Sequence, residues 1–102
     1  MGNPETSPTL HVNSVVVASL DQVSSDLGGQ TVLLSMRSAM YYGFEGIGSR
    51  LWELVQSPAR VGDVCEAIAT EYDVDAARAE FDTLAFLRQL LEKGLLEVRS
   101  GA

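Results

Sequence analysis

The stretch TVLLSMRSAMYYGFEGIGSRLW, residues 31–52, decides the fold of this chain. Residues 31–36 are mostly β-branched or aliphatic and predict a strand, and residues 39–44 predict a second strand after a short turn at Arg37-Ser38. Side chains alternate across a pleated strand, so the large and small residues of the second strand separate onto two faces. The core-facing set is Met40, Tyr42 and Phe44, and the opposite set is Ala39, Tyr41 and Gly43.

N-terminal to this hairpin, residues 12–20 predict a further strand, because Val15, Val16 and Val17 are β-branched. Residues 21–30 are rich in Asp, Ser and Gly and predict a loop, in which Gly28-Gly29 supplies the reversal. If the three strands form a simple antiparallel meander, the strand at 39–44 lies at its edge. One row of its backbone N–H and C=O groups is then unpaired.

Three amphipathic helices are expected after the strands. The first begins near Glu45 or Gly46 and ends at Ser57-Pro58, and the second, residues 61–72, buries Cys65 within its apolar stripe. The third runs from an Asp75 N-cap to about residue 94. Its predicted core stripe is Ala77, Phe81, Leu84, Leu87 and Leu91, and a second apolar strip away from the core is Ala79, Phe86 and Leu90. Such a strip needs a partner, and residues 95–98 either pack under the core or pair with the sheet.

Composition indicates one compact domain of 102 residues, 46% of them hydrophobic. We expect a disordered arm at residues 1–11, the folded domain at 12–98 and a tail at 99–102. Seven Lys and Arg against fourteen Asp and Glu give a net charge of −7, which repels nucleic acid phosphates and anionic membranes. With one cysteine, no secretion signal and no apolar run of about 18 residues, the sequence favours a cytoplasmic protein.

Catalysis is disfavoured by the residues present. The single Cys65 lies on a buried stripe and the single His11 on the expected arm, so a nucleophile and its base are not brought together. No second cysteine or histidine completes a zinc site, and no Asp-Ser-Leu element marks a carrier domain. We therefore expect a binding protein with no cofactor and no metal, not an enzyme.

A DNA-binding regulator remains an alternative, because many DNA-binding domains place one helix in the major groove. The third helix carries Arg78, Arg88 and Lys93, but it also carries acidic residues at 80, 82 and 92. This mixture differs from the basic footprint that phosphate contacts require.

The order and spacing of several short motifs resemble PqqD-like proteins, the RiPP recognition elements that include leader-binding proteins of lasso-peptide clusters. The motifs are Thr31-Val32-Leu33-Leu34, Tyr41-Tyr42, Gly48 with Leu51-Trp52, Tyr72-Asp73, Phe86-Leu87 and Gly94-Leu95-Leu96. Two positions depart from the family pattern. Ala39 stands where a glycine often precedes the paired aromatic residues, and Phe44-Glu45 replaces Leu-Asn. We expect Ala39 to keep a β conformation at the exit of the turn.

The resemblance implies an α+β, winged-helix-like domain with a three-stranded antiparallel sheet followed by three helices. It implies that a precursor's leader peptide binds as an extra strand beside residues 39–44, against the third helix. The expected peptide-binding residues are Ala39, Tyr41, Gly43, Asp82, Phe86, Gln89 and Leu90. The implied partners are a leader peptidase and a lasso cyclase, with a radical-SAM enzyme as the nearest variant. Leaders of lasso systems often carry a Tyr-x-x-Pro element, which implies an apolar slot for it.

Simpler structural roles compete with these assignments. Tyr42 and Trp52 are expected in the core, Tyr41 is equally compatible with packing or with peptide contact, and Asp82 belongs by default to a solvated helix face. The strip containing Phe86 and Leu90 can be covered by the C-terminal tail or by a second copy of the chain. An apolar strip beside an open strand edge also permits a homodimer.

Overall fold

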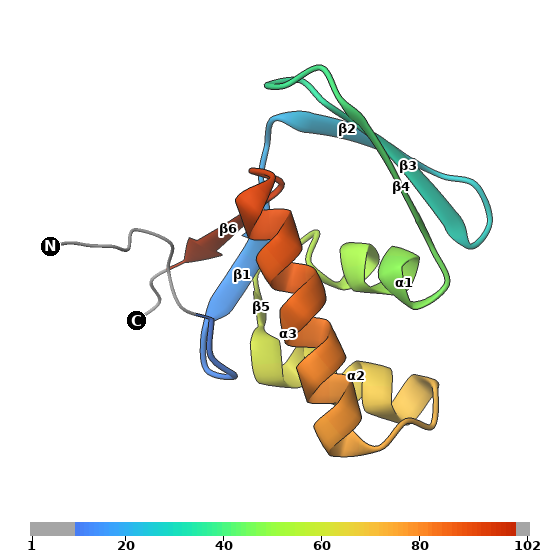
Figure 1. Ribbon diagram of the computed structural model, residues 1–102, viewed down its shortest axis with the longest axis vertical. Helices are drawn as coiled ribbons and strands as arrows, with labels where there is room; N and C mark the ends of the chain where they lie inside the picture. The colour runs from blue at the N-terminus through green and yellow to red at the C-terminus, as the bar shows by residue number, and fades with distance from the viewer. Residues whose placement is uncertain (1–9, 100–102) are drawn as a thin grey trace, which may run out of the picture.

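The computed structural model describes residues 10–99, which form two small antiparallel sheets and three helices (Figure 1). The first sheet contains, in order, β2 (Gln22–Asp26), β3 (Gln30–Ser35) and β4 (Tyr41–Glu45). The second contains β5 (Ala59–Arg60), β1 (Val15–Ala18) and β6 (Leu96–Arg99). The helices are α1 (Ile47–Leu54), α2 (Val61–Glu71) and α3 (Ala76–Glu92). The predicted α+β class, with antiparallel strands and three helices, is confirmed.

The expected pairing of the first strand is wrong. β1 lies between β5 and β6 and does not join the hairpin at 31–44 (Figure 1). Val16 and Val17 are both buried, although they point to opposite sides of the strand, so β1 is covered on both faces. A strand of this kind also requires partners on both edges, and the segment at 95–98 supplies one of them as β6.

The predicted loop at 21–30 contains a strand. β2 pairs along its length with β3, from Gln22 opposite Ser35 to Asp26 opposite Thr31. The serine-rich sequence of β2 has a low intrinsic preference for the strand conformation. Pairing with the edge of β3 therefore explains the conformation of β2 better than its own strand propensity does. The reversal at Gly28 and Gly29 is confirmed, because both have positive φ.

The turn between β3 and β4 is longer than the predicted Arg37-Ser38 pair. The strands end at Ser35 and resume at Tyr41, and Ser35 N donates to Met40 O across the base of the loop at 2.9 Å. Ala39 has φ of 58°, in the left-handed region. The expectation that Ala39 keeps a β conformation at the strand edge is therefore wrong, because closing this loop requires a backbone reversal there.

An ion-pair group joins the first two helices. Arg50 of α1 donates from Nε to Glu71 Oε1 of α2 at 2.8 Å and from Nη1 to Glu53 Oε1 at 2.9 Å. These contacts raise the pKa of Arg50, and the hydrogen bond from Arg50 lowers the pKa of Glu71. All three side chains are partly solvated, so the pairs orient α1 against α2 more than they stabilise the fold.

Helix α3 begins as predicted, since the Asp75 carboxylate accepts from Arg78 N at 3.2 Å. Its predicted core face is wrong at the N-terminal half, because Phe81 is 71% exposed and Ala77 is also exposed. The residues buried on α3 are Ala79, Thr83, Leu87 and Leu90, while Leu84, Phe86 and Leu91 are partly buried. The small side chains at 79 and 83 allow α3 to lie close to α2, and this close packing sets the rotation of the helix.

The main core lies between β1, β6, α1 and the C-terminal half of α3, and it contains Val16, Leu33, Trp52 and Leu87. Trp52 is buried, as expected. Leu10 is buried in the same cluster although we expected it in the disordered arm, and the rest of that arm, residues 1–9, and residues 100–102 of the tail lie outside the described residues. None of the described helices combines the length and the apolar character needed to cross a bilayer.

The rotation of α3 is tested by a pair of truncations. Leu87→Ala should lower the free energy of unfolding by about 2–5 kcal/mol, because it opens a cavity in the main core. Phe81→Ala should change the free energy of unfolding by less than about 0.5 kcal/mol, because the side chain is solvated. Urea denaturation measures both. Comparable losses for the two variants would contradict this placement of the helix faces.

Candidate functional site

The edge of β4 is open within the described residues, because β4 pairs with β3 and with no other strand there. Two flanking hydrogen bonds fix which backbone groups face β3: Ser35 N donates to Met40 O, and Gly46 N donates to Gly29 O. Successive residues of a strand direct their backbone groups to opposite sides. The groups of Tyr42 and Phe44 therefore face β3, and those of Tyr41, Gly43 and Glu45 point outward.

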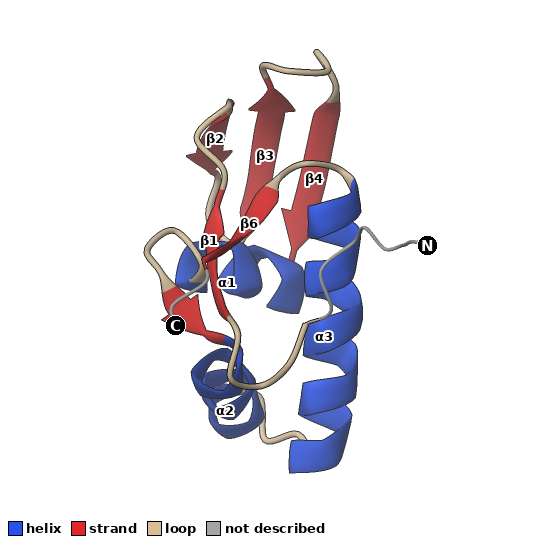
Figure 2. Ribbon diagram, turned by 90° about the vertical axis from the view of Figure 1, so that its left-hand side faces the viewer, coloured by secondary structure: helices blue, strands red, loops and turns tan. Residues whose placement is uncertain are grey.

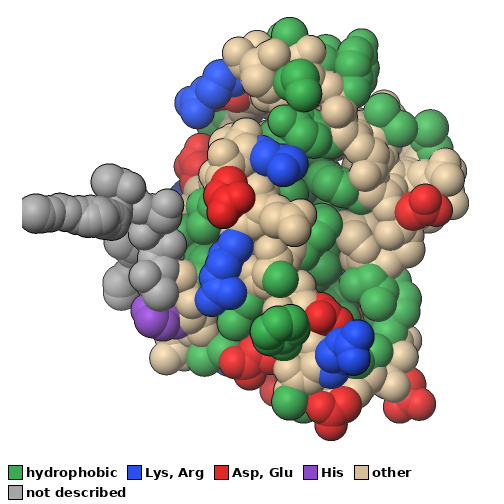
Figure 3. Space-filling view, viewed as in Figure 1, with side chains coloured by type: hydrophobic (Ala, Val, Ile, Leu, Met, Phe, Trp, Pro, Cys, Tyr) green, Lys and Arg blue, Asp and Glu red, His purple; other side chains and the backbone are tan. Residues whose placement is uncertain are grey.

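Helix α3 lies beside this edge and forms the opposite side of a groove. Figure 2 shows β4 as the strand of its sheet nearest to α3. In Figure 3 hydrophobic side chains gather in a hollow beside α3, on the side where β4 and α1 lie. Asp82, Phe86 and Gln89 follow one another at i, i+4 and i+7, so they share one face of the helix. An edge strand and the face of α3 that carries Phe86 between Asp82 and Gln89 therefore lie next to each other.

Aromatic side chains join the two sides of the groove at its base. The ring of Phe44 from β4 lies 5.4 Å from that of Phe86, centroid to centroid, in an edge-to-face arrangement, and 5.8 Å from that of Trp52. Gly48 of α1 lies beneath Phe86, and a Cβ added there would lie 3.4 Å from Phe86 Cε1. The lack of a side chain at position 48 thus allows α1 and the aromatic group to approach closely.

A pocket of about 270 Å³ opens between α1 and α3 beside these rings. Its walls are mostly apolar and include Ile47, Gly48, Leu51, Val74, Asp82 and Phe86. Asp82 is the acidic group of the lining, and its carboxylate accepts from Arg78 Nε at 2.9 Å. The arrangement suits an apolar or aromatic side chain that carries a hydrogen-bond donor at its tip.

Five of the seven residues that the sequence assigned to the site lie on the edge strand or on the face of α3 that carries Phe86. Tyr41 and Gly43 lie on the edge strand, and Asp82, Phe86 and Gln89 lie on the facing side of α3. Leu90 is 2% exposed and packs in the main core, so its side chain anchors α3 to the core and does not line the surface of the groove. Ala39 lies in the turn before β4, not on the edge itself.

Sequence analysis did not assign Ile47, Gly48 and Val74 to the site. The sequence did contain an indication that Gly48 lies at a contact, because a glycine inside a helical segment often marks a close approach of another element. Val74 lies in the connection between α2 and α3, and the hydrophobic pattern of the chain gives no indication of where that connection folds.

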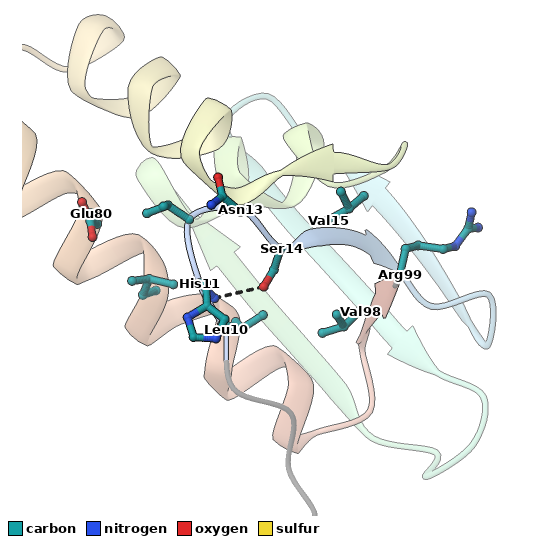
Figure 4. Close-up of a pocket in the computed structure, with 10 residues that line it drawn as sticks. Leu10, His11, Asn13, Ser14, Val15, Glu80, Val98 and Arg99 are labelled. Atoms are coloured by element: carbon teal, nitrogen blue, oxygen red, sulfur yellow. Dashed lines mark hydrogen bonds between the residues drawn. The ribbon is translucent and has the colours of Figure 1, made fainter. Parts of the chain in front are cut away.

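A second cavity lies on the other side of α3 (Figure 4). It has about 730 Å³ and is open to solvent between residues 10–15, β6 and residues Glu80 and Leu84 of α3. Positions 80 and 84 are each two residues from 82 and 86, which is about 200° of helix rotation. The cavity is therefore separate from the groove. Its polar side chains are solvated, and the His11 backbone N–H that lines it donates to Ser14 Oγ at 3.0 Å.

The single cysteine, Cys65, is buried. Burial raises the pKa of the Cys65 thiol, and the nearby Thr83 hydroxyl lowers that pKa by a smaller amount. Thr83 Oγ1 is buried and has no hydrogen-bond partner of normal geometry. A protonated, buried thiol is a poor nucleophile. Residues 10–99 contain no group of three His, Cys, Asp or Glu side chains placed to hold a metal ion.

An open strand edge beside a helix face with an aromatic residue and an adjacent pocket is typical of domains that bind extended peptides by strand addition. The family model for coenzyme PQQ synthesis protein D (PqqD) matches residues 30–96, which include the whole groove. The chain belongs to the PqqD family.

Three solved structures are similar to this chain, whereas no curated protein matches it. TbiB1, described in complex with the TbiA(beta) leader peptide, is 37% identical over 79% of this chain and 94% of its own, with a TM-score of 0.75. A lasso peptide synthetase B1 complexed with the leader peptide is 22% identical, with coverages of 80% and 96% and a TM-score of 0.67. The PqqD truncation of Methylobacterium extorquens PqqCD, described as a stand-alone RiPP recognition element, is 21% identical, with coverages of 87% and 95% and a TM-score of 0.71.

The left-handed conformation of Ala39 predicts that Ala39→Gly stabilises the protein. Glycine adopts positive φ without the steric cost that alanine has there, so the free energy of unfolding should rise by up to about 1 kcal/mol. Thermal and urea denaturation measure the change. The control Ala85→Gly, on the exposed surface of α3, should instead lower stability by about 1 kcal/mol. Destabilisation by both variants would contradict the left-handed turn.

Proposed function

We propose that this chain binds the leader segment of a ribosomally synthesised precursor peptide as an added strand along β4, against α3. The observation that carries the proposal is the unpaired row of backbone groups at Tyr41, Gly43 and Glu45, on the strand whose Phe44 contacts Phe86 of α3. The 37% identical relative TbiB1, described in complex with a leader peptide, supports it.

Main-chain pairing and side-chain pockets contribute to leader recognition in different ways. Backbone hydrogen bonds to β4 supply affinity with little dependence on leader sequence, whereas the walls of the groove supply specificity. We assign the pocket beside Phe86 and Gly48 to an aromatic residue of the leader, whose hydroxyl or amide can donate to Asp82. Gln89 extends the same wall toward the C-terminal end of α3.

The chain's role is affinity and presentation, with the chemistry performed by other proteins. We propose that it delivers the bound precursor to a leader peptidase and a lasso cyclase in the cytoplasm. Binding along an open edge leaves the outer face of the β2–β3–β4 sheet and the outer surfaces of α1 and α2 free for an enzyme. A radical-SAM enzyme is the alternative recipient within the same family.

Salt dependence separates this function from DNA binding. A labelled leader from the chain's own precursor, with the TbiA(beta) leader as a second probe, should bind with nearly the same affinity at about 50 and about 200 mM salt. A mixed-sequence duplex should bind weakly, and any binding should fall steeply over that range. Fluorescence anisotropy measures both. Tight, salt-sensitive duplex binding without leader binding would favour the regulator.

A proline at Gly43 tests strand addition. Gly43→Pro removes an N–H that points away from β3, so the hydrogen bonds between β3 and β4 stay intact. The leader loses one hydrogen bond to β4, and the affinity of the protein for the leader should fall about five- to tenfold. Gly43→Ala is the control. A methyl group there would meet no atom closer than Thr31 O at 4.0 Å, and the N–H is retained, so leader affinity should be unchanged. Equal affinity of both variants for the leader would rule out pairing at this edge.

A further inference from the structure

A pocket of about 260 Å³ lies on the outer face of the β2–β3–β4 sheet, near the end of β4 that leads into α1. Strand register places Val32 opposite Gly43 and Gln30 opposite Glu45. Since side chains alternate across a strand, these four positions share the face opposite buried Leu33. The lining of this Gly43 pocket is Gln30, Thr31, Val32, Gly43, Phe44 and Glu45. The Gly43 pocket is thus separate from the pocket between α1 and α3.

The missing side chain of Gly43 opens this pocket. Gly43 does not have positive φ, so its own backbone conformation does not require glycine. A Cβ added there would meet no atom closer than Thr31 O at 4.0 Å, so position 43 is surrounded by open space. Val32, directly across the strand pair, therefore has no side-chain neighbour at 43 and is 40% exposed. A glycine within a strand often marks a place where another group approaches closely.

A leader strand added along β4 would lie beside the Gly43 pocket. A leader residue that pairs with Gly43 projects its side chain to the same face as position 43, because adjacent strands share one pleat. No side chain at 43 stands in between, so a long side chain of that leader residue can lie across the Gly43 backbone and contact Val32. A single methyl group at 43 would leave most of the pocket open, which agrees with the neutral effect expected for Gly43→Ala.

Glu45 determines the charge of the Gly43 pocket. It is exposed, and it makes no ion pair with any residue of the described range 10–99. Glu45 lies two positions along β4 from Gly43, which makes it a diagonal neighbour of the leader residue that pairs with Gly43. Diagonal neighbours on adjacent strands are about 7–8 Å apart, within reach of a long side chain. Lys and Arg lay their methylene chains along apolar surface and keep their charge in water, which matches Val32 on one side and Glu45 on the other.

We infer that the Gly43 pocket is a second specificity subsite for the leader, and that it takes a lysine or arginine side chain. The methylene chain of this leader residue lies over Gly43 against Val32, and its charge pairs with Glu45. The inference rests on the proposed function and deepens it, because it adds recognition on the outer face of the sheet to recognition in the groove between β4 and α3.

A double-mutant cycle between leader and protein tests the ion pair. The probes are the labelled leader of the chain's own precursor and peptides in which one Lys or Arg at a time is replaced by Met, which keeps a long apolar chain and removes the charge. One of these peptides should bind the unmodified protein about two- to fivefold more weakly than the leader does, the range expected for a partly exposed ion pair. Glu45→Gln should weaken binding of the unmodified leader by the same factor. Combining the two changes should cost no more than either change alone. Fluorescence anisotropy measures these affinities.

Two further variants separate the local contact from general charge and from backbone pairing. Glu66→Gln is the matched control, because it removes the same charge from an exposed position on α2, and affinity for every probe should stay within about 1.5-fold. Gly43→Leu keeps the N–H that pairs with the leader but fills the pocket, so leader affinity should fall about fivefold or more. Adding Glu45→Gln to Gly43→Leu should then have no further effect.

The outcomes are distinguishable. Failure of the unmodified protein to bind leader refutes the proposed function in the first titration, before any variant is compared. Normal leader binding with no Lys or Arg position coupled to Glu45 overturns the cationic subsite and leaves strand addition standing. Equal or tighter leader binding by Gly43→Leu shows that no leader side chain enters the pocket, which also overturns the inference.

Discussion

The edge-to-face contact between Phe44 of β4 and Phe86 of α3 couples the edge of one sheet to the helix that packs on the other sheet. Trp52 supports Phe44 from α1, and Gly48 lets α1 approach Phe86. Without this group the β2–β3–β4 sheet would be connected to the main core chiefly through Leu33 and Tyr42. The width of the groove is therefore set by ring packing in the hydrophobic core and not by any polar contact at its surface.

An open strand edge is an aggregation liability, and here its position limits the risk. α3 stands beside β4, so a second sheet cannot approach that edge as freely as a single narrow strand can. The outward groups belong to Tyr41, Gly43 and Glu45, and the negative charge of Glu45 further disfavours pairing between identical acidic chains. The groove between β4 and α3 therefore favours binding of a single extended segment with complementary side chains and disfavours pairing with the edge of another sheet.

The sequence predicted the elements around the site better than it predicted their partners. The hairpin, the Asp75 cap and the buried Cys65 follow from local patterns, since each depends on neighbouring residues. The strand predicted at 39–44 is observed at Tyr41–Glu45 and lies at the edge of its sheet, although the meander from which that position was inferred has a different first strand. β2 was missed because its conformation comes from the edge of β3. The rotation of α3 was misjudged because apolar residues occur almost all round the helix, and the small residues Ala79 and Thr83, not the large Phe81, meet α2. The conformation of Ala39 depends on closing a loop whose length the residue pattern did not specify.

The same helix explains why this winged-helix-like arrangement is poorly suited to DNA. A recognition helix must direct several unpaired cations at phosphates, but on α3 Arg78 is paired with Asp82, and Arg88 and Lys93 are accompanied by the acidic residues Glu80 and Glu92. The side of α3 that could enter a groove of DNA instead forms the wall beside β4, with Phe86 as its largest side chain. Opening that wall to a duplex would separate Phe86 from Phe44 and expose the aromatic group, whereas an extended peptide can occupy the groove with the packing intact.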